Sequence, residues 1–267
     1  MTGRGWTEAD VAAVLRSPTA SDDKYSRGVV GMRTGSTAFP GAAVLGVEAA
    51  WRTGVGMVRY LGPAASLVLA RRPETVAAAG RVQAWVIGSG TNAASRDAAE
   101  TEALREVLEG SVPVVVDAGA LDLAPAASAP VIVTPHAGEH GQLRDALGLD
   151  ADVDSPAETA TALGAVVVRK GARSEIAAPG LDSLVVEAPT SWLATAGTGD
   201  VLAGIVGALA AGADATDAPT LQRIAASAVW LHGQAASAAV AANGGGPIVA
   251  LDVAEHIPGV IGRVLRR

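Results

Sequence analysis

The chain of 267 residues has no cysteine, and aromatic residues make up only 3% of it. The lack of cysteine excludes disulfides and thiolate metal sites, and it leaves the cytoplasm as the expected compartment. Acidic residues outnumber basic ones by 27 to 20, and no basic stripe is present, so neither nucleic acid nor a membrane surface is an expected partner. The longest charge-free apolar run, Val201 to Ala213, is too short to span a bilayer.

Most predicted strands are continuous runs of valine and isoleucine, and they alternate with helical segments through the first two thirds of the chain. Such runs are typical of parallel strands buried on both faces. We predict strands over residues 28–32, 55–61, 82–87, 113–117, 131–134, 165–169, 174–178 and 183–188. We predict helices over residues 7–16, 41–52, 96–109, 138–148, 155–164, 199–211, 219–242 and 251–266, and assign no structure to 64–80. No linker or repeat divides the chain, so one α/β domain over residues 1–267 is expected.

Glycine and polar residues recur just after the predicted strands, in residues 33–41, 88–92, 117–119, 134–139 and 170–174. In an open parallel sheet the ligand crevice lies outside the carboxyl ends of the strands. These segments therefore predict a ligand site at one edge of the sheet.

The stretch from Leu193 to Gly212 places two glycines, Gly197 and Gly199, immediately before Asp200 and a buried helix. The free amides of a first helical turn and the helix dipole make such a turn a natural anion site. Two interpretations remain open: Asp200 caps the helix, or a phosphate binds the amides of residues 197–199 with Asp200 facing a substrate hydroxyl. The same dipole predicts that Asp200 stays ionised and is a weak base at neutral pH.

The sequence motifs of three known kinds of site fit this chain poorly. Gly88-Ser-Gly-Thr-Asn-Ala93 matches a dinucleotide fingerprint, but the next acidic strand end, Asp117, comes later than that site requires. His136-Ala-Gly-Glu-His140 matches a zinc-peptidase string, but Pro135 and Gly138 mark a strand-to-helix turn where that motif needs a helix. The chain contains no Gly-Lys-Ser/Thr, so a P-loop is excluded.

The remaining polar segments each have a purely structural alternative. Residues 170–174 follow a buried strand with a lysine and a flexible turn, which also suits a solvated hairpin. Residues 134–139 suit a capped turn. Asp117 could hydrogen-bond only to nearby backbone amides, and Gly41-Ala42 could serve ordinary helix packing.

Taken together, these segments resemble one family, the ADP/ATP-dependent NAD(P)H-hydrate dehydratases of the ribokinase-like fold. The matching strings cover residues 39–43, 52–56, 87–90, 113–121, 134–139, 170–171, 197–204 and 231–233, in the order the family has them. The resemblance implies a three-layer αβα sandwich with a central, mostly parallel sheet. Family members are often fused to an epimerase domain, and the length of the chain suggests a stand-alone dehydratase.

The resemblance also implies a role for individual residues. Asp200 matches the catalytic acidic residue that contacts the hydrate, and Ala42, Gly90 and His136 match positions lining the hydrate pocket. Residues matching the nucleotide site are Lys170, Gly171, Ala172, Arg173 and Ser174 in one turn and Gly197, Thr198 and Gly199 in another. ADP or ATP is the implied co-substrate, with Mg²⁺ on its phosphates. Asp117 and Glu139 are candidates for contacts to that metal through water, and a homo-oligomer, a tetramer in the family, is expected.

The implied reaction is dehydration of the S epimer of NADHX or NADPHX to NADH or NADPH. The hydrate's hydroxyl takes a phosphoryl group, ADP becomes AMP or ATP becomes ADP, and phosphate then leaves. Two departures from the family pattern bear on the site: Ala196 replaces the first of two paired glycines, and residues 88–92 read Gly-Ser-Gly-Thr-Asn instead of the commoner Gly-Pro-Gly-Leu-Gly.

Two other functions stay open. A small-molecule kinase of the same fold, acting on a vitamin precursor, would give a stable phosphorylated product. A binding protein that kept the fold without the chemistry would be indifferent to the change Asp200→Asn.

Overall fold

The computed structural model describes residues 3–150 and 152–266, and the predicted domain over 1–267 includes residues 1–2, 151 and 267, which lie outside them. The described residues form a nine-stranded sheet in the order β1-β9-β8-β7-β6-β5-β4-β2-β3. Its strands are β1 (Arg4–Gly5), β2 (Val29–Arg33), β3 (Met57–Tyr60), β4 (Ala84–Ile87), β5 (Val114–Val116), β6 (Val131–Val133), β7 (Val166–Arg169), β8 (Arg173–Ala177) and β9 (Leu184–Glu187).

The sheet is mostly parallel. Neighbouring strands from β3 to β7 pair in parallel, as do β1 and β9, whereas β8 is antiparallel to both of its neighbours. The carboxyl ends of β2, β4, β5, β6 and β7 therefore lie along one edge. The predicted mostly parallel sheet is confirmed.

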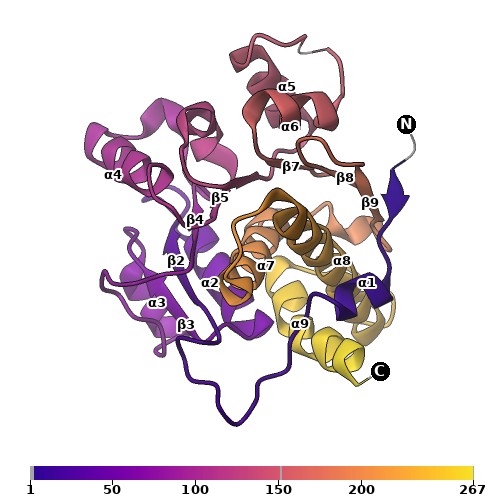
Figure 1. Ribbon diagram of the computed structural model, residues 1–267. Helices are drawn as coiled ribbons and strands as arrows, with labels where there is room; N and C mark the ends of the chain where they lie inside the picture. The colour runs from indigo at the N-terminus through magenta and orange to yellow at the C-terminus, as the bar shows by residue number, and fades with distance from the viewer. Residues whose placement is uncertain (1–2, 151, 267) are drawn as a thin grey trace.

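Helices cover both faces of the sheet, and no helix of the described residues is long and apolar enough to cross a membrane (Figure 1). The α-helices are α1 (Glu8–Ala12), α2 (Gly41–Thr53), α3 (Ala65–Arg71), α4 (Ala98–Leu108), α5 (Ala137–Ala146), α6 (Pro156–Leu163), α7 (Thr198–Ala213), α8 (Ala218–Ala242) and α9 (Ala250–Leu265). Short 3₁₀ segments η1 (Ala93–Ser95), η2 (Ala118–Ala126) and η3 (Ser191–Leu193) complete the chain.

Each face of the sheet packs against a hydrophobic core of its own. Val115 faces the core shared with α2, α7, α8 and α9, whereas its neighbours Val114 and Val116 face the core shared with α4, η2, α5 and α6. Successive side chains of a strand point to opposite faces, so a continuous valine run supplies both cores at once. This arrangement confirms the three-layer αβα sandwich.

The predicted helices and strands are present with shifts of a few residues at their ends. The capping box expected in the first helix forms between Thr7 and Asp10, although the helix ends at Ala12. The unassigned residues 64–80 contain α3. The two-residue strand β1 was not predicted, because it is too short to leave a periodic pattern.

Helices α2 and α7 approach each other closely through glycine. A Cβ added at Gly204 of α7 would lie 2.3 Å from the carbonyl oxygen of Gly46 and 3.0 Å from the Cβ of Ala49, both on α2. A Cβ at Gly46 would in turn lie 3.5 Å from the carbonyl oxygen of Asp200. These contacts fix the position of the first turn of α7 against α2.

Gly204→Ala should therefore destabilise the fold by about 1–3 kcal/mol, because the added methyl forces the two helix backbones apart. Gly212→Ala is the matched control on the same helix, since its Cβ would come no closer than 3.7 Å to the carbonyl oxygen of Arg27. That change should be neutral or stabilise by up to about 1 kcal/mol. Urea unfolding measures both, and equal effects of the two variants would contradict the close-packing account.

Candidate active site

The segments that follow β4, β5, β6 and β7 meet at the carboxyl edge of the sheet. The N–H of Gly35 donates to the carbonyl oxygen of Ser89 at 2.7 Å, and the N–H of Lys170 donates to that of Pro135 at 2.8 Å. His136 and Lys170 also pair through a parallel bridge. The polar segments predicted to share one edge are therefore in contact.

Asp117 is the centre of this edge. Its carboxylate is buried, with 3% of the residue exposed, and it directly follows β5. Oδ1 accepts from Thr134 Oγ1 at 2.7 Å and from Lys170 Nζ at 2.9 Å, and Oδ2 accepts from Ser89 Oγ at 2.9 Å. Since a buried charge is costly unless it is paired and hydrogen-bonded, these three donors are what keep Asp117 in place. The alternative that Asp117 binds only nearby backbone is wrong.

Lys170 lies in the turn between β7 and β8, which is a hairpin, but its side chain is not solvated. Nζ lies 2.9 Å from Asp117 Oδ1 and 3.9 Å from Glu139 Oε2. Burial alone would lower the pKa of Lys170, but the charges of Asp117, Glu139 and Asp200 outweigh it and the pKa is raised. The ammonium is therefore charged, and only 20% of the side chain is exposed.

The head of α7, residues 197–200, faces this ammonium. Gly197 has a φ of +88°, a left-handed conformation that favours glycine, and it precedes the first helical residue, Thr198. A Cβ added at Gly199 would lie 3.6 Å from Lys170 Nζ. Among the described residues, the N–H groups of Gly199 and Asp200 have no hydrogen-bond partner, so the turn presents free donors beside a cation.

Asp200 does not cap α7, because it is the third residue of the helix. The residue at the cap position is Gly197, which has no side chain to accept a hydrogen bond. Burial, and after it the negative charge of Asp117, raise the pKa of Asp200 to about 7, although the positive charge of Lys170 partly opposes them. The expectation that the helix dipole keeps this carboxylate ionised as a weak base is wrong. Desolvation and a second carboxylate outweigh the dipole.

His136 and Glu139 form the capping box of α5. His136 Nδ1 accepts from the N–H of Gly138 at 3.1 Å and from that of Glu139 at 3.2 Å, and Glu139 Oε2 accepts from the N–H of His136 at 2.7 Å. The predicted capped turn is confirmed. His136 is the cap rather than a helical residue and its Nδ1 is occupied, so the zinc-peptidase motif is not formed.

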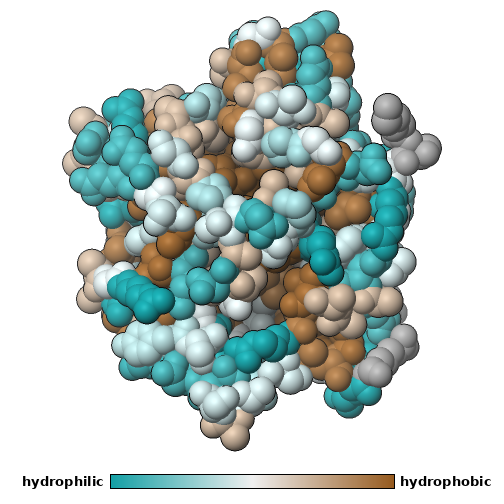
Figure 2. Space-filling model, viewed as in Figure 1, coloured by the Kyte–Doolittle hydropathy of each residue, from teal (hydrophilic) through white to brown (hydrophobic). Residues whose placement is uncertain are grey.

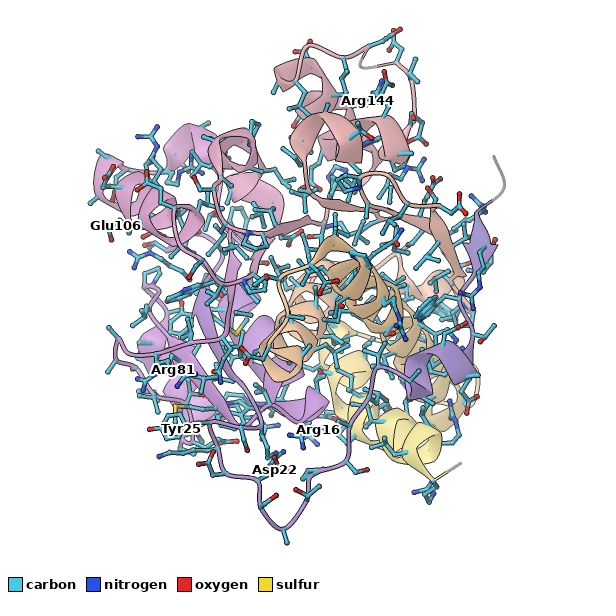
Figure 3. The ribbon with its side chains drawn as sticks, viewed as in Figure 1. Arg16, Asp22, Tyr25, Arg81, Glu106 and Arg144 are labelled. Atoms are coloured by element: carbon cyan, nitrogen blue, oxygen red, sulfur yellow. The ribbon has the colours of Figure 1, made fainter. Side chains whose placement is uncertain are left out.

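Helix α5 is braced against α6 by a buried cluster. His140 Nε2 lies 2.9 Å from Thr159 Oγ1, and Arg144 Nη1 donates to the same oxygen at 3.1 Å. Arg144 Nη2 pairs with Glu158 Oε2 at 2.8 Å, and Figure 3 shows Arg144 between the two helices. The cluster joins α5, whose first turn carries Glu139, to α6.

The residues that match the hydrate pocket form a second part of the edge. A Cβ added at Gly90 would lie 2.3 Å from the Cβ of Ala42 and 2.9 Å from the carbonyl oxygen of Phe39, so the loop after β4 touches the start of α2. Gly90 follows Ser89, which binds Asp117. Ala42 lies one turn before Gly46 on α2, and Gly46 faces the backbone of Asp200. Ala42 and Gly90 thus lie close to the head of α7.

The other residues that match the nucleotide site lie at the β7–β8 turn and at the head of α7. Ser174 is buried in β8, and its Oγ exchanges hydrogen bonds with the backbone of Gly171, which stabilises the turn through Ala172. Arg173 is exposed and pairs with Glu187 at 3.4 Å. Thr198 Oγ1 donates to the carbonyl oxygens of Leu193 and Thr195, each at 2.9 Å, and so holds the head of α7.

The described side chains form no magnesium site by themselves, and of the three carboxylates at this edge only that of Asp200 accepts no hydrogen bond. No group of three or more His, Cys, Asp or Glu that could hold a metal occurs among residues 3–150 and 152–266. Both oxygens of Asp117 already accept hydrogen bonds, and Glu139 Oε2 caps α5. Magnesium sites normally combine one or two free carboxylates with waters and phosphates.

Sequence analysis gave no role to His232 of α8. His232 is 8% exposed and its ring interacts with the backbone of Thr198. Burial lowers the pKa of His232 to about 4. Nε2 has no hydrogen-bond partner among the described residues. A neutral imidazole therefore supports the head of α7 from within the fold. The string Leu231-His-Gly233 was its only signal in the sequence.

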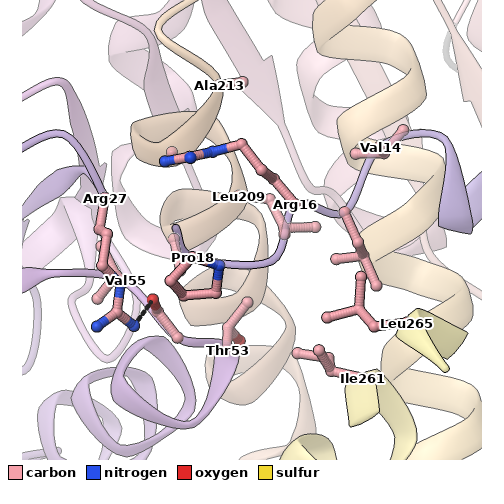
Figure 4. Close-up of a pocket in the computed structure, with 14 residues that line it drawn as sticks. Val14, Arg16, Pro18, Arg27, Thr53, Val55, Leu209, Ala213, Ile261 and Leu265 are labelled. Atoms are coloured by element: carbon pink, nitrogen blue, oxygen red, sulfur yellow. Dashed lines mark hydrogen bonds between the residues drawn. The ribbon is translucent and has the colours of Figure 1, made fainter. Parts of the chain in front are cut away.

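A separate pocket lies at the opposite end of the sheet, between the chain after α1 and helices α7 and α9 (Figure 4). It is lined by Leu209 near the end of α7 and by Ile261 and Leu265 of α9, whereas Asp200 lies in the first turn of α7. In Figure 2 hydrophobic residues gather over this part of the surface. None of the predicted site residues lines this pocket.

Comparison with known proteins identifies the family. A family model described as NAD(P)H-hydrate dehydratase matches residues 30–258, which is most of the chain. The chain belongs to this family.

Similar proteins include one that this chain covers almost completely and others that are about twice as long. A Mycobacterium tuberculosis protein described as a bifunctional NAD(P)H-hydrate repair enzyme is 46% identical over 219 residues, covering 78% of this chain and 46% of that protein. The chain thus spans about half the length of the first such relatives. A Xanthomonas campestris ADP-dependent (S)-NAD(P)H-hydrate dehydratase is 32% identical, with 96% of both chains covered. The crystal structure of a Bacillus subtilis ADP/ATP-dependent NAD(P)H-hydrate dehydratase, co-crystallised with ATP and Mg²⁺, has a TM-score of 0.85, 28% identity and 99% coverage of both chains.

The two departures from the dehydratase pattern are accommodated without backbone strain. Ala196 is not among the residues with positive φ, so the turn needs glycine at 197 and not at 196. Ser89, at the position where the family commonly has proline, adds a hydroxyl that donates to Asp117.

The raised pKa of Asp200 predicts how stability depends on pH. A carboxyl whose folded pKa is about 7, against an ordinary 3.8, favours the folded state while it is protonated, and this contribution is lost as pH rises from about 4 to 7. Asp200→Asn should therefore gain on the order of 2 kcal/mol over the wild type between pH 5 and pH 8. Urea unfolding at both pH values measures the difference, and parallel stability profiles for the two proteins would show that Asp200 titrates normally.

Proposed function

We propose that the protein dehydrates the S epimer of NADHX or NADPHX to NADH or NADPH, using ADP or ATP as phosphoryl donor. The observation that carries this proposal is the juxtaposition of the head of α7, with its free amides, the Lys170 ammonium, and the Asp200 carboxylate. Family membership and the ADP-dependent activity in the name of the Xanthomonas relative support the choice of substrate and donor.

We propose that the nucleotide's terminal phosphate binds the turn of Gly197, Thr198 and Gly199 through the N–H groups of Gly199 and Asp200, because the N–H of Thr198 already donates to the carbonyl oxygen of Thr195. Phosphoryl transfer needs mostly positioning and electrostatic stabilisation, and amides at a helix N-terminus provide both. Lys170, whose Nζ lies beside Gly199, supplies the positive charge for the moving phosphoryl group. The rest of the turn, from Gly171 to Ser174, holds the remainder of the nucleotide.

The hydrate is placed between Ala42, Gly90 and His136, with its ring hydroxyl facing Asp200. The hydroxyl oxygen attacks the terminal phosphorus, the bond from that phosphorus to the nucleotide's bridging oxygen breaks, and the hydroxyl proton passes to Asp200. The carbon–oxygen bond of the phosphorylated intermediate then breaks and phosphate leaves. Loss of a proton from the neighbouring carbon restores the dihydronicotinamide ring.

Asp200 suits the role of base because its pKa of about 7 lies near the operating pH. Magnesium is expected to accompany the nucleotide's phosphates and to reach Asp117 and Glu139 through water, since both oxygens of Asp117 and Oε2 of Glu139 already accept hydrogen bonds. A cytoplasmic location, a homotetramer and a single domain over 1–267 stay predictions, and light scattering of the purified protein measures the second of them.

Purified protein should convert (S)-NADHX to NADH and free phosphate when ADP or ATP is supplied with Mg²⁺, followed by the near-ultraviolet absorbance of the reduced ring. The free-enzyme kcat/KM should rise with pH and level off above about 7, because only the ionised Asp200 accepts the proton. Asp200→Asn should lose at least about 100-fold in kcat while still binding nucleotide.

Three results would contradict the proposal. Absence of NADH formation with either nucleotide would remove the dehydratase function. A stable phosphorylated product in mass spectrometry would favour a small-molecule kinase. Full activity of Asp200→Asn would exclude the proposed base.

A further inference from the structure

Asp117 has no role of its own in the proposed reaction, yet its buried carboxylate accepts three side-chain hydrogen bonds. Its donors come from three segments: Ser89 after β4, Thr134 after β6 and Lys170 after β7. A carboxylate placed only to join loops would not need a lysine whose ammonium also faces the head of α7. The arrangement indicates a role in the chemistry of the neighbouring groups.

We propose that Asp117 is a positioning residue for catalysis: its carboxylate fixes the Lys170 ammonium against the head of α7, and its charge sets the electrostatic environment of Asp200. The proposal rests on the proposed function, because it assigns Asp117 a role in that reaction.

The fixing of Lys170 follows from geometry. Lysine is a flexible side chain that loses considerable rotamer freedom when it is held in one place. Here the 2.9 Å bond to Asp117 Oδ1 holds Nζ, and Glu139 Oε2 at 3.9 Å adds a weaker attraction. Asp117 itself cannot rotate freely, because Ser89 binds its second oxygen from the opposite side. The cation is thus in place before a phosphate arrives.

The electrostatic effect follows from the charges around Asp200. Burial has the largest effect on its pKa, Asp117 adds a like charge that raises it, and Lys170 opposes both. Glu139 acts on Lys170, and His232, which interacts with the Thr198 backbone, is neutral. Asp117 is therefore the charged group that moves Asp200 toward neutral pH, so that Asp200 is a stronger base than an exposed aspartate.

Asp117→Asn tests the proposal, because it keeps the shape and the oxygen facing Lys170 but removes the charge. Ser89 can reverse its hydroxyl to accept from the new amide. The acid limb of kcat/KM should move down by about one pH unit, as expected for loss of a nearby like charge. We also expect kcat to fall about tenfold or more, with little change in KM for the hydrate, because Lys170 is no longer fixed by an ion pair.

A second readout does not depend on activity. In the wild-type background, the free energy of unfolding of Asp200→Asn minus that of its parent should increase with pH up to about pH 7. In the Asp117→Asn background, the same difference should stop increasing at a lower pH. If Asp117→Asn does not fold, Asp117→Ser removes the same charge from a smaller side chain and takes its place. Ser89→Ala and Thr134→Val are matched controls, since each removes a hydrogen bond to Asp117 but keeps its charge, and each should leave the acid limb unmoved.

The outcomes separate this proposal from the proposed function. An inactive wild type would refute the dehydratase function, while the stability readout would still decide the effect of Asp117 on Asp200. An active wild type whose acid limb and stability profile are unchanged in Asp117→Asn would overturn the role given to Asp117. Equal shifts in Ser89→Ala or Thr134→Val would also overturn it, because they would trace the effect to packing and not to charge.

Discussion

The ion pair between Asp117 and Lys170 is the interaction on which the rest of the site depends. It joins the segment after β5 to the segment after β7, and the hydroxyls of Ser89 and Thr134 tie it to the strands on either side. Breaking a buried pair by removing one partner leaves an uncompensated charge, so the loss of either residue should lower the stability of the fold. The pair therefore fixes the carboxyl edge of the sheet and the charge that this edge presents.

The opposite side of the site is fixed by backbone contact. Gly46 and Gly204 allow α2 and α7 to touch, which places the free amides of residues 199 and 200 opposite Lys170. At the start of α2, Ala42 lies next to Gly90, and at the start of α7 the carboxylate of Asp200 makes no capping bond. Free backbone amides, a cation and a carboxylate whose pKa is raised to about 7 thus lie together where two helices pack against one sheet edge.

Much of the fold and part of the site could be predicted from the sequence. Continuous valine runs such as 114–116 identified buried parallel strands, and the glycine and polar residues after them identified the edge that carries the candidate site. Properties that depend on tertiary contact could not be predicted. The predicted charge state of Asp200 was wrong, because its pKa depends on its burial and on its neighbour Asp117, which the fold sets and its position in the helix does not. Ser89 was seen only as a departure from the family pattern, because the carboxylate it binds lies 28 residues away.

The most direct test of the account is a crystal structure with a non-hydrolysable ATP analogue and the hydrate bound. The account predicts the terminal phosphate at the head of α7 on the amides of Gly199 and Asp200, with Lys170 Nζ in hydrogen-bond contact with it and the Asp200 carboxylate facing the hydrate's hydroxyl. A nucleotide bound elsewhere, with Asp200 turned away from both ligands, would contradict it.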